Sequence, residues 1–271
     1  MIAMPRPRAN SSIACCSVRL AIQPVGLLGD EIKIALVRAS QRANSLSRSR
    51  CQRVLFQSSS SRTEQQAILE FARGRGIAII SDEVYGTLVY DGSAHAPSFL
   101  QIAEENDAVF VINSFSKPWA MTGWRIGWLT HPRDLGETMR ILSPVANTGT
   151  TTFNQYGALA ALTPEGEAFR ESLRARCEAN RTVVQDFIAR QNRVRWMAPM
   201  GAFYGYLQFD GMTDSLALAK DLVTRANVGT APGSAFSLGD PRDDAYLRVC
   251  FARDPQGLAE GLRRIESALK A

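Results

Sequence analysis

Two short runs of uninterrupted apolar residues constrain the fold of this chain more than any other feature. The run IAII covers residues 77–80, and the run AVFVI covers residues 108–112. A short run that is apolar at every position is typical of a strand buried on both faces of a sheet. A third apolar strand, WRIGWL, is predicted at residues 124–129. With a helix predicted before the first strand, the alternation indicates an α/β fold with a mostly parallel sheet.

The helix before the first strand carries its own start and stop signals. Thr63 and Gln66 have the spacing of a capping box, and Gly74 and Gly76 are expected to end the helix. The face predicted to be buried consists of Ala67, Ile68, Phe71 and Ala72.

The pattern changes in the second half of the chain. Helices are predicted around residues 153–162 and over 164–191, the second opened by Pro164 and long enough to connect two domains. Short strands and two further helices, at residues 215–226 and 255–271, follow and indicate a small α+β domain. The predicted organisation is an atypical segment (1–60), part of a large domain (61–163), a connecting helix (164–191) and a small C-terminal domain (192–271).

Charge is distributed unevenly along the 271 residues. The net charge is +5, but residues 1–60 carry +7 and the remainder carries −2. This Arg- and Ser-rich segment, with one possible helix at residues 29–43, is either an atypical arm or a transit peptide. A nucleic-acid surface is disfavoured, because basic residues would have to cluster with aromatic residues or a recognisable motif.

Cysteine and histidine usage argues against disulfides and metals. The five cysteines contain no C-x-x-C pair, and the two histidines, His95 and His131, have no partners at metal-ligand spacing. We therefore expect reduced thiols, a cytoplasmic location and no metal site.

Polar side chains of complementary chemistry follow the predicted strands. Asp82 and Tyr85 come after the first strand, Ser114 and Lys117 after the second, and Arg125 opens the third. In α/β sheets, ligands bind beyond the carboxyl ends of strands. A carboxylate, a phenol, an amine, a hydroxyl and a guanidinium together suit a phosphorylated, electron-poor aromatic aldehyde.

Lys117 is set among apolar neighbours. Three tryptophans, Trp119, Trp124 and Trp128, follow it closely in the sequence. An ammonium is costly to bury, so a partly desolvated lysine is expected to become a nucleophile toward carbonyls. Each residue alone also has an ordinary structural explanation, Asp82 as a turn or cap residue and Arg125 as a stacked surface residue. The order and spacing of the whole set favour the chemical interpretation.

The motifs SDEVY, SFSK and GWRIG, followed by PMGAFYGYLQF, APGSAF and AYLRVCFA, resemble those of class I/II aminotransferases. The resemblance covers roughly residues 61–271. It implies the fold-type I (aspartate-aminotransferase) fold and pyridoxal 5'-phosphate (PLP) as cofactor. It also implies a ping-pong exchange of an amino group between an amino acid and a 2-oxo acid, and a homodimer.

The resemblance implies a role for each matching residue. Lys117 would carry PLP as an internal aldimine, Asp82 would pair with the pyridine nitrogen, and Tyr85 would bond the ring's phenolic oxygen. Ser114 and Arg125 match phosphate ligands. Arg248 matches the arginine that binds the substrate α-carboxylate. Strand alternation supports that position, because Leu247, Val249 and Phe251 are predicted to face the core and Arg248 the opposite side.

The first 60 residues depart from the family pattern. An N-P-T-G stretch is expected near residues 54–57, which read VLFQ, and the first 84 residues contain no tyrosine. We therefore expect weak PLP binding and an exposed apolar sheet edge. Two alternatives to a working aminotransferase stay open: a truncated non-catalytic remnant or partner chain, and a PLP-dependent lyase on the same fold.

Overall fold

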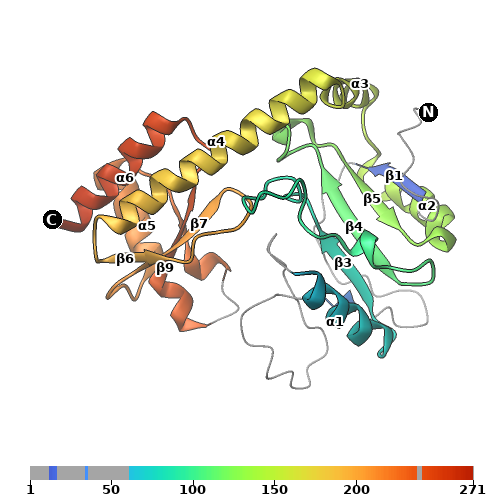
Figure 1. Cartoon of the computed structure of the whole chain (residues 1–271), viewed down its shortest axis with the longest axis horizontal. Coiled ribbons are helices and arrows are strands. Elements are labelled where there is room, and N and C mark those ends of the chain that lie inside the picture. Colours follow the sequence, from blue (N-terminus) through green and yellow to red (C-terminus); the bar gives the residue numbers. More distant parts are fainter. Residues whose placement is uncertain (1–11, 17–33, 36–60, 237–239, 271) are drawn as a thin grey trace. The chain divides into compact units, whose positions relative to one another are not determined.

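The computed structural model describes residues 12–16, 34–35, 61–236 and 240–270 (Figure 1). The chain divides into two compact units, Met1–Glu171 and Ser172–Ala271, and the boundary falls inside the long helix α4 (Pro164–Ala189). Across the described ranges, every helix is too short or too polar to cross a lipid bilayer.

The first unit is built on a five-stranded mixed sheet. Strands β2, β3 and β4 are parallel, whereas β5 runs antiparallel to both β4 and β1. The order across the sheet is β1 (Ser12–Cys16), β5 (Gly127–His131), β4 (Val109–Ser114), β3 (Ala78–Asp82) and β2 (Ile34–Ala35).

The two outer strands come from the N-terminal segment. β1 pairs along the whole length of β5, and β2 pairs with Ala78 and Ile79 of β3. The expectation of an open sheet edge is therefore wrong along β5. The helix expected at residues 29–43 is wrong at Ile34–Ala35, which form β2; its other residues lie outside the described ranges. The N-P-T-G position at 54–57 also lies outside them.

The capping box of helix α1 (Arg62–Arg73) lies two residues earlier than expected, at Ser61 instead of Thr63. Ser61 Oγ accepts a hydrogen bond from Glu64 N at 3.2 Å, and Glu64 Oε2 accepts one from Ser61 N at 2.7 Å. The box predicted from Thr63 and Gln66 is wrong. Both pairs have the required spacing, but only the earlier pair adds a carboxylate charge to the helix N-terminus. Gly74 caps the C-terminus, as expected.

The buried face of α1 is shifted as well. It consists of Gln65, Leu69 and Ala72, while Ala67 is exposed. Gln65 is buried because its Nε2 donates to Pro97 O at 2.9 Å, and periodicity of apolar residues gives no sign of such a bond.

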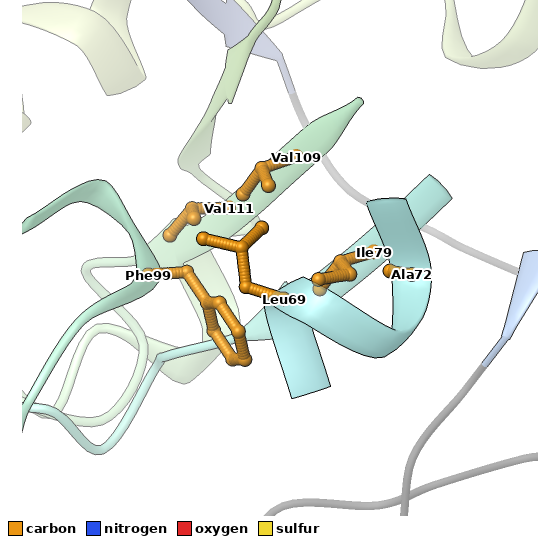
Figure 2. Packing of buried hydrophobic residues seen from close by; sticks show 6 residues of the cluster. All are labelled: Leu69, Ala72, Ile79, Phe99, Val109 and Val111. Atoms are coloured by element: carbon orange, nitrogen blue, oxygen red, sulfur yellow. The ribbon is translucent and has the colours of Figure 1, made fainter. Parts of the chain in front are cut away.

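The core of the first unit lies between α1 and the sheet. Figure 2 shows Leu69 at the centre of this group, surrounded by side chains from β3, β4 and the 3₁₀ helix Phe99–Gln101. Six buried residues form it: Leu69, Ala72, Ile79, Phe99, Val109 and Val111. This packing fixes the relative positions of β3 and β4.

Two more helices complete the first unit before α4. Helix α3 (Thr152–Ala161) was expected, but α2 (Gly136–Asn147) was not. No side chain caps the start of α2, and Pro144 lies inside it, so the usual sequence signals are missing. The contacts of α2 with β1 show that tertiary packing holds it.

The second unit contains an antiparallel sheet. Its order is β6 (Val194–Trp196), β7 (Tyr204–Phe209), β9 (Tyr246–Cys250) and β8 (Ala231–Pro232). Besides the greater part of α4 it contains α5 (Ser215–Ala226), with the bounds expected from the sequence, and α6 (Pro255–Lys270). Leu247 and Phe251 are fully buried, which confirms the predicted alternation along β9.

Truncating Leu69 should destabilise the first unit strongly. Its side chain is 1% exposed, so Leu69→Ala removes buried apolar surface and leaves a cavity, at a cost of about 2–5 kcal/mol. Leu100→Ala, at a site 42% exposed, is the matched control and should cost less than about 1 kcal/mol. Urea unfolding followed by tryptophan fluorescence measures both. Equal destabilisation by the two changes would contradict the assigned core.

Candidate active site

The strand directions bring the polar residues of the first unit to one edge of the sheet. Asp82 ends β3 opposite Ile112, and Ser114 ends β4 opposite Gly127. Since β3 and β4 are parallel, their carboxyl ends lie at the same edge. Since β5 is antiparallel, its start lies there too. The segment that carries Arg125 therefore approaches this edge from the other direction.

Gly127 allows β5 to approach β4 closely at this edge. A Cβ at position 127 would lie 2.5 Å from Asn113 O and 3.3 Å from Ser114 Cβ. No other residue fits without moving the backbone of one strand. The second glycine of the GWRIG motif, Gly127, therefore allows the segment that carries Arg125 to lie against the end of β4.

Arg125 precedes β5 instead of opening it. The predicted strand 124–129 is wrong at its start, because Thr122–Trp124 form a 3₁₀ helix and Arg125 is left-handed at φ 52° and ψ 49°. Arg125 Nη1 donates to Thr122 O at 2.9 Å, and Thr122 Oγ1 donates to Ser116 O at 3.0 Å. These bonds hold a backbone conformation that is costly for a residue with a side chain and join Arg125 to the turn after β4.

The hydroxyl of Ser114 is engaged within the protein. Its Oγ accepts the Ser116 N–H at 3.0 Å and lies 2.9 Å from Ile126 O and 2.8 Å from Ser116 Oγ. Ser116 is buried, and it was not assigned a site role from the sequence. The two serines of the S-x-S-K motif thus form one hydrogen-bonded pair that fastens the end of β4 to the residue before Gly127.

Lys117 lies in the turn that follows this pair and is half-buried. The tryptophans expected around it pack mainly on Phe115: the Trp119 and Trp128 rings lie 5.1 Å and 5.3 Å from the Phe115 ring. Trp124 is 42% exposed and instead covers Gly157 of α3, where a Cβ would lie 2.1 Å from the indole. The aromatic residues therefore form a rigid support under the turn.

Asp82 is close enough to Lys117 for their charges to interact. Burial of the carboxyl group raises the pKa of Asp82; a hydrogen bond from Val84 N (3.3 Å) and the charge of Lys117 partly oppose this. Asp82 is nevertheless exposed to solvent at the end of β3, so burial opposes its ionisation only in part. Tyr85 lies three residues on, in the turn after β3, where its carbonyl accepts from Leu88 N at 2.8 Å.

Glu83 is a second carboxyl group beside Asp82, and no motif had singled it out. Its Oε1 accepts hydrogen bonds from Ser81 Oγ at 3.0 Å and from Phe99 N at 3.1 Å. Burial raises the pKa of Glu83, more than these bonds lower it. Glu83 thus fastens the segment between Asp82 and Tyr85 to β3 and to the 3₁₀ helix that begins at Phe99.

Arg248 belongs to the second unit, where it lies on the face of β9 opposite the core. Its guanidinium carbon lies 4.3 Å from the ring centres of both Tyr204 and Phe236. Tyr206 and Tyr246, on the same face, stack at 4.6 Å. Neither ring beside Arg248 was predicted as a site residue.

Comparison with known proteins identifies the family. The model of aminotransferase class I and II matches residues 58–265, so the chain belongs to this family. A probable aspartate/prephenate aminotransferase from Aquifex aeolicus is 36% identical over 213 residues, which are 76% of this chain and 52% of that protein. A valine–pyruvate aminotransferase from Mycobacterium tuberculosis is 35% identical over 207 residues, again 76% and 52%.

Solved structures agree with the fold. An aminotransferase from Mycobacterium tuberculosis matches with a TM-score of 0.70 and 34% identity over 78% of this chain and 54% of that one. An aromatic aminotransferase from Pyrococcus horikoshii matches with a TM-score of 0.70 and 29% identity over 78% and 56%. The expected fold-type I aminotransferase fold is confirmed. The chain spans about half the length of the curated relatives it matches.

The half-buried carboxyl group of Glu83 should make stability depend on pH. Its pKa is raised in the folded state, so the folded chain binds more protons than the unfolded chain between the two pKa values, and stability falls as pH rises through that window. Glu83→Gln keeps an acceptor oxygen but no charge. The wild type should therefore lose stability relative to Glu83→Gln as pH increases above the usual glutamate value of about 4.3.

Urea unfolding at a series of pH values measures this difference. Glu70→Gln, at an exposed position on α1, is the matched control for loss of one carboxylate. A wild-type advantage over Glu83→Gln that stays constant or grows with pH would show that burial of this group does not oppose its ionisation.

Proposed function

We propose that this chain carries the catalytic half of a PLP-dependent aminotransferase, which moves an amino group between an amino acid and a 2-oxo acid by a ping-pong mechanism. The observation that supports this best is the sheet edge at which the ends of β3 and β4 bring Asp82 and the segment of Ser114 and Lys117 together, inside the region that matches the family. The relatives act on different substrates by name, so the proposal extends to the substrate class and not to a particular amino acid.

The groups at this edge fit PLP. Asp82 is a carboxylate with unfavourable ionisation, which a protonated ring nitrogen would relieve. Arg125 and the serine pair offer phosphate donors. The proton of Ser114 points to Ile126 O or to Ser116 Oγ, so Ser114 would have to turn its hydroxyl to donate to a phosphate. Tyr85 would donate to the ring oxygen.

Each residue then has a chemical task. When bound, PLP supplies an electron sink for the substrate's Cα carbanion. Lys117 Nζ would hold the cofactor and, as a free amine, would take the proton from the substrate Cα and pass it on to the cofactor. Asp82 would hold the pyridine nitrogen in its protonated form. Arg248 binds the substrate carboxylate through its fork of N–H donors.

The match covers only about half of the length of the relatives, which leaves one alternative to a working aminotransferase. Because the chain covers about half of its relatives, a non-catalytic remnant or a partner chain for a separate first half is the second candidate. A lyase on the same fold is distinguished by its products, a cleaved side chain instead of a 2-oxo acid.

The proposed location is the cytoplasm.

Covalent labelling tests the proposal. The chain is incubated with PLP, reduced with borohydride and mapped by mass spectrometry. We expect the pyridoxyl label on Lys117, and Lys117→Arg should lose at least about 90% of it because a guanidinium forms no Schiff base at neutral pH. Lys220→Arg, on α5, is the control and should keep the label. A label on other lysines, with Lys117 unmodified, would favour the non-catalytic alternative.

We also propose that the chain forms a homodimer through α2 and α3. Large apolar side chains on these helices are exposed, and such surfaces mark protein contacts. They are Ile141, Leu142, Val145, Phe153 and Tyr156, with Val145 81% exposed.

A charge placed on this surface should separate the subunits. Val145→Asp would bury a carboxylate in the interface, so the dimer dissociation constant should rise at least about tenfold. Val223→Asp, at a position 51% exposed on α5, is the matched control. Sedimentation velocity over a range of concentrations measures both. A monomeric wild type, or equal weakening by both variants, would contradict this interface.

A further inference from the structure

The second unit places Arg248 on an aromatic surface. Arg248 is paired with Tyr206 of β7 on one side and with Ala231 of β8 on the other. Alternate residues of β7 and β9 are buried, which leaves Arg248 and three tyrosines together on the opposite face. The tyrosines are Tyr204, Tyr206 and Tyr246.

Two rings contact the guanidinium of Arg248 at the same time. Tyr204, from β7, and Phe236, at the end of the 3₁₀ helix Gly233–Phe236, each lie 4.3 Å from its central carbon. We call these three residues the Arg248 clamp. A cation is attracted to the face of an aromatic ring at this distance. Neither ring carries an anionic group, so neither neutralises the charge of the guanidinium.

The segment that carries Phe236 is itself fixed. A Cβ at Gly233 would lie 2.0 Å from Asp243 O and 2.8 Å from the Tyr206 hydroxyl, so only glycine fits there. Ser234 N donates to Ser215 Oγ at 3.1 Å, and Ser215 Oγ donates to Asp244 Oδ1 at 3.0 Å. The APGSAF motif therefore presents Phe236 to Arg248 from an anchored turn.

Among the described residues, no acid neutralises the charge of Arg248. Within residues 61–236 and 240–270, the contacts of its guanidinium are with the two rings, and no carboxylate forms an ion pair with it. Other arginines of this unit, such as Arg195 with Asp210 and Arg225 with Asp221, do form ion pairs. Arg248 is thus held in place while its capacity to bind an anion is kept.

We infer that Tyr204 and Phe236 are positioning residues that hold the Arg248 guanidinium ready for the carboxylate of the substrate. This inference rests on the proposed function. Rings restrict a flexible side chain without competing for its N–H donors, whereas a carboxylate partner would have to be displaced by the substrate. The clamp therefore lowers the entropic cost of binding a carboxylate.

Nitrogen NMR of the full chain tests the clamp directly. The Arg248 Nε–H signal is assigned by its loss in Arg248→Lys. In the wild type we expect slow rotation of the guanidinium, and faster rotation in Phe236→Leu and Tyr204→Leu. Tyr204→Phe keeps the ring and should keep the slow rotation. Arg195, on β6 of the same sheet, is the internal control and should be unchanged in all variants.

Titration with pyruvate then tests the purpose of the clamp. The Arg248 signal should shift on addition of pyruvate but not of sodium chloride at equal ionic strength. Each loss of a ring should weaken this binding roughly 2- to 30-fold, the range expected for one cation–π contact. Tyr204→Phe should bind pyruvate as the wild type does. It serves as the folded control for Tyr204→Leu, because it changes the same position and keeps the ring.

The outcomes separate this inference from the proposed function. A guanidinium that rotates freely in the wild type, or pyruvate binding that is unchanged in both leucine variants, would overturn the clamp even if Lys117 is labelled. No response of Arg248 to pyruvate would overturn its role toward carboxylates. A restricted and pyruvate-responsive Arg248 in a chain whose Lys117 takes no label would support the clamp and defeat the aminotransferase proposal.

Discussion

The parallel pairing of β3 with β4 is the constraint on which the rest of the first unit depends. It places Asp82 and Ser114 at one edge of the sheet, and it requires the packing of Leu69 against both strands. Reversal of direction at β5 is equally necessary, because only an antiparallel strand brings the residues before it to the same edge. Gly127 makes that return possible at close range, since any side chain would collide with the backbone of β4.

The sequence predicted the strands of this edge well because their cause is local. The continuous apolar runs before Asp82 and Ser114 end within two residues of the observed strand ends, but Phe110 and Ile112 are only half-buried, so β4 is fully buried on one face and not on both. The alternation around Arg248 is a local signal of the same kind. The features that the sequence did not predict depend on contacts between residues far apart in the chain. Gln65 is buried by a bond to a carbonyl more than thirty residues away, and α2 is held by contacts with β1 despite an internal proline.

The residues of the candidate site divide in the same way, into those that a local motif reveals and those that only long-range contacts place. Asp82, Lys117, Arg125 and Arg248 lie in motifs that could be read from the sequence. The residues that hold these side chains in place could not be recognised in this way. Ser116, Glu83 and Phe236 act through hydrogen bonds or ring contacts that only the folded chain creates. A spacing of two between serines could have indicated the Ser114–Ser116 pair, since such neighbours share a turn. Nothing in the sequence relates Phe236 to Arg248, which are twelve residues apart and belong to different elements.

Under the proposed function, Lys117 and Arg248 are two cations with opposite requirements. A proton carrier must be able to lose its charge, and Lys117 lies in the turn after β4, at the sheet edge where β3 ends in Asp82. A carboxylate receptor must keep its charge, which a guanidinium does at any physiological pH, and rings support Arg248 without neutralising it. Under the proposed function, the unfavourable burial of Asp82 is a cost of the free chain that a protonated ring nitrogen would remove. Binding of the cofactor and stability of the edge of β3 should therefore be coupled, with Asp82 as the residue that links them.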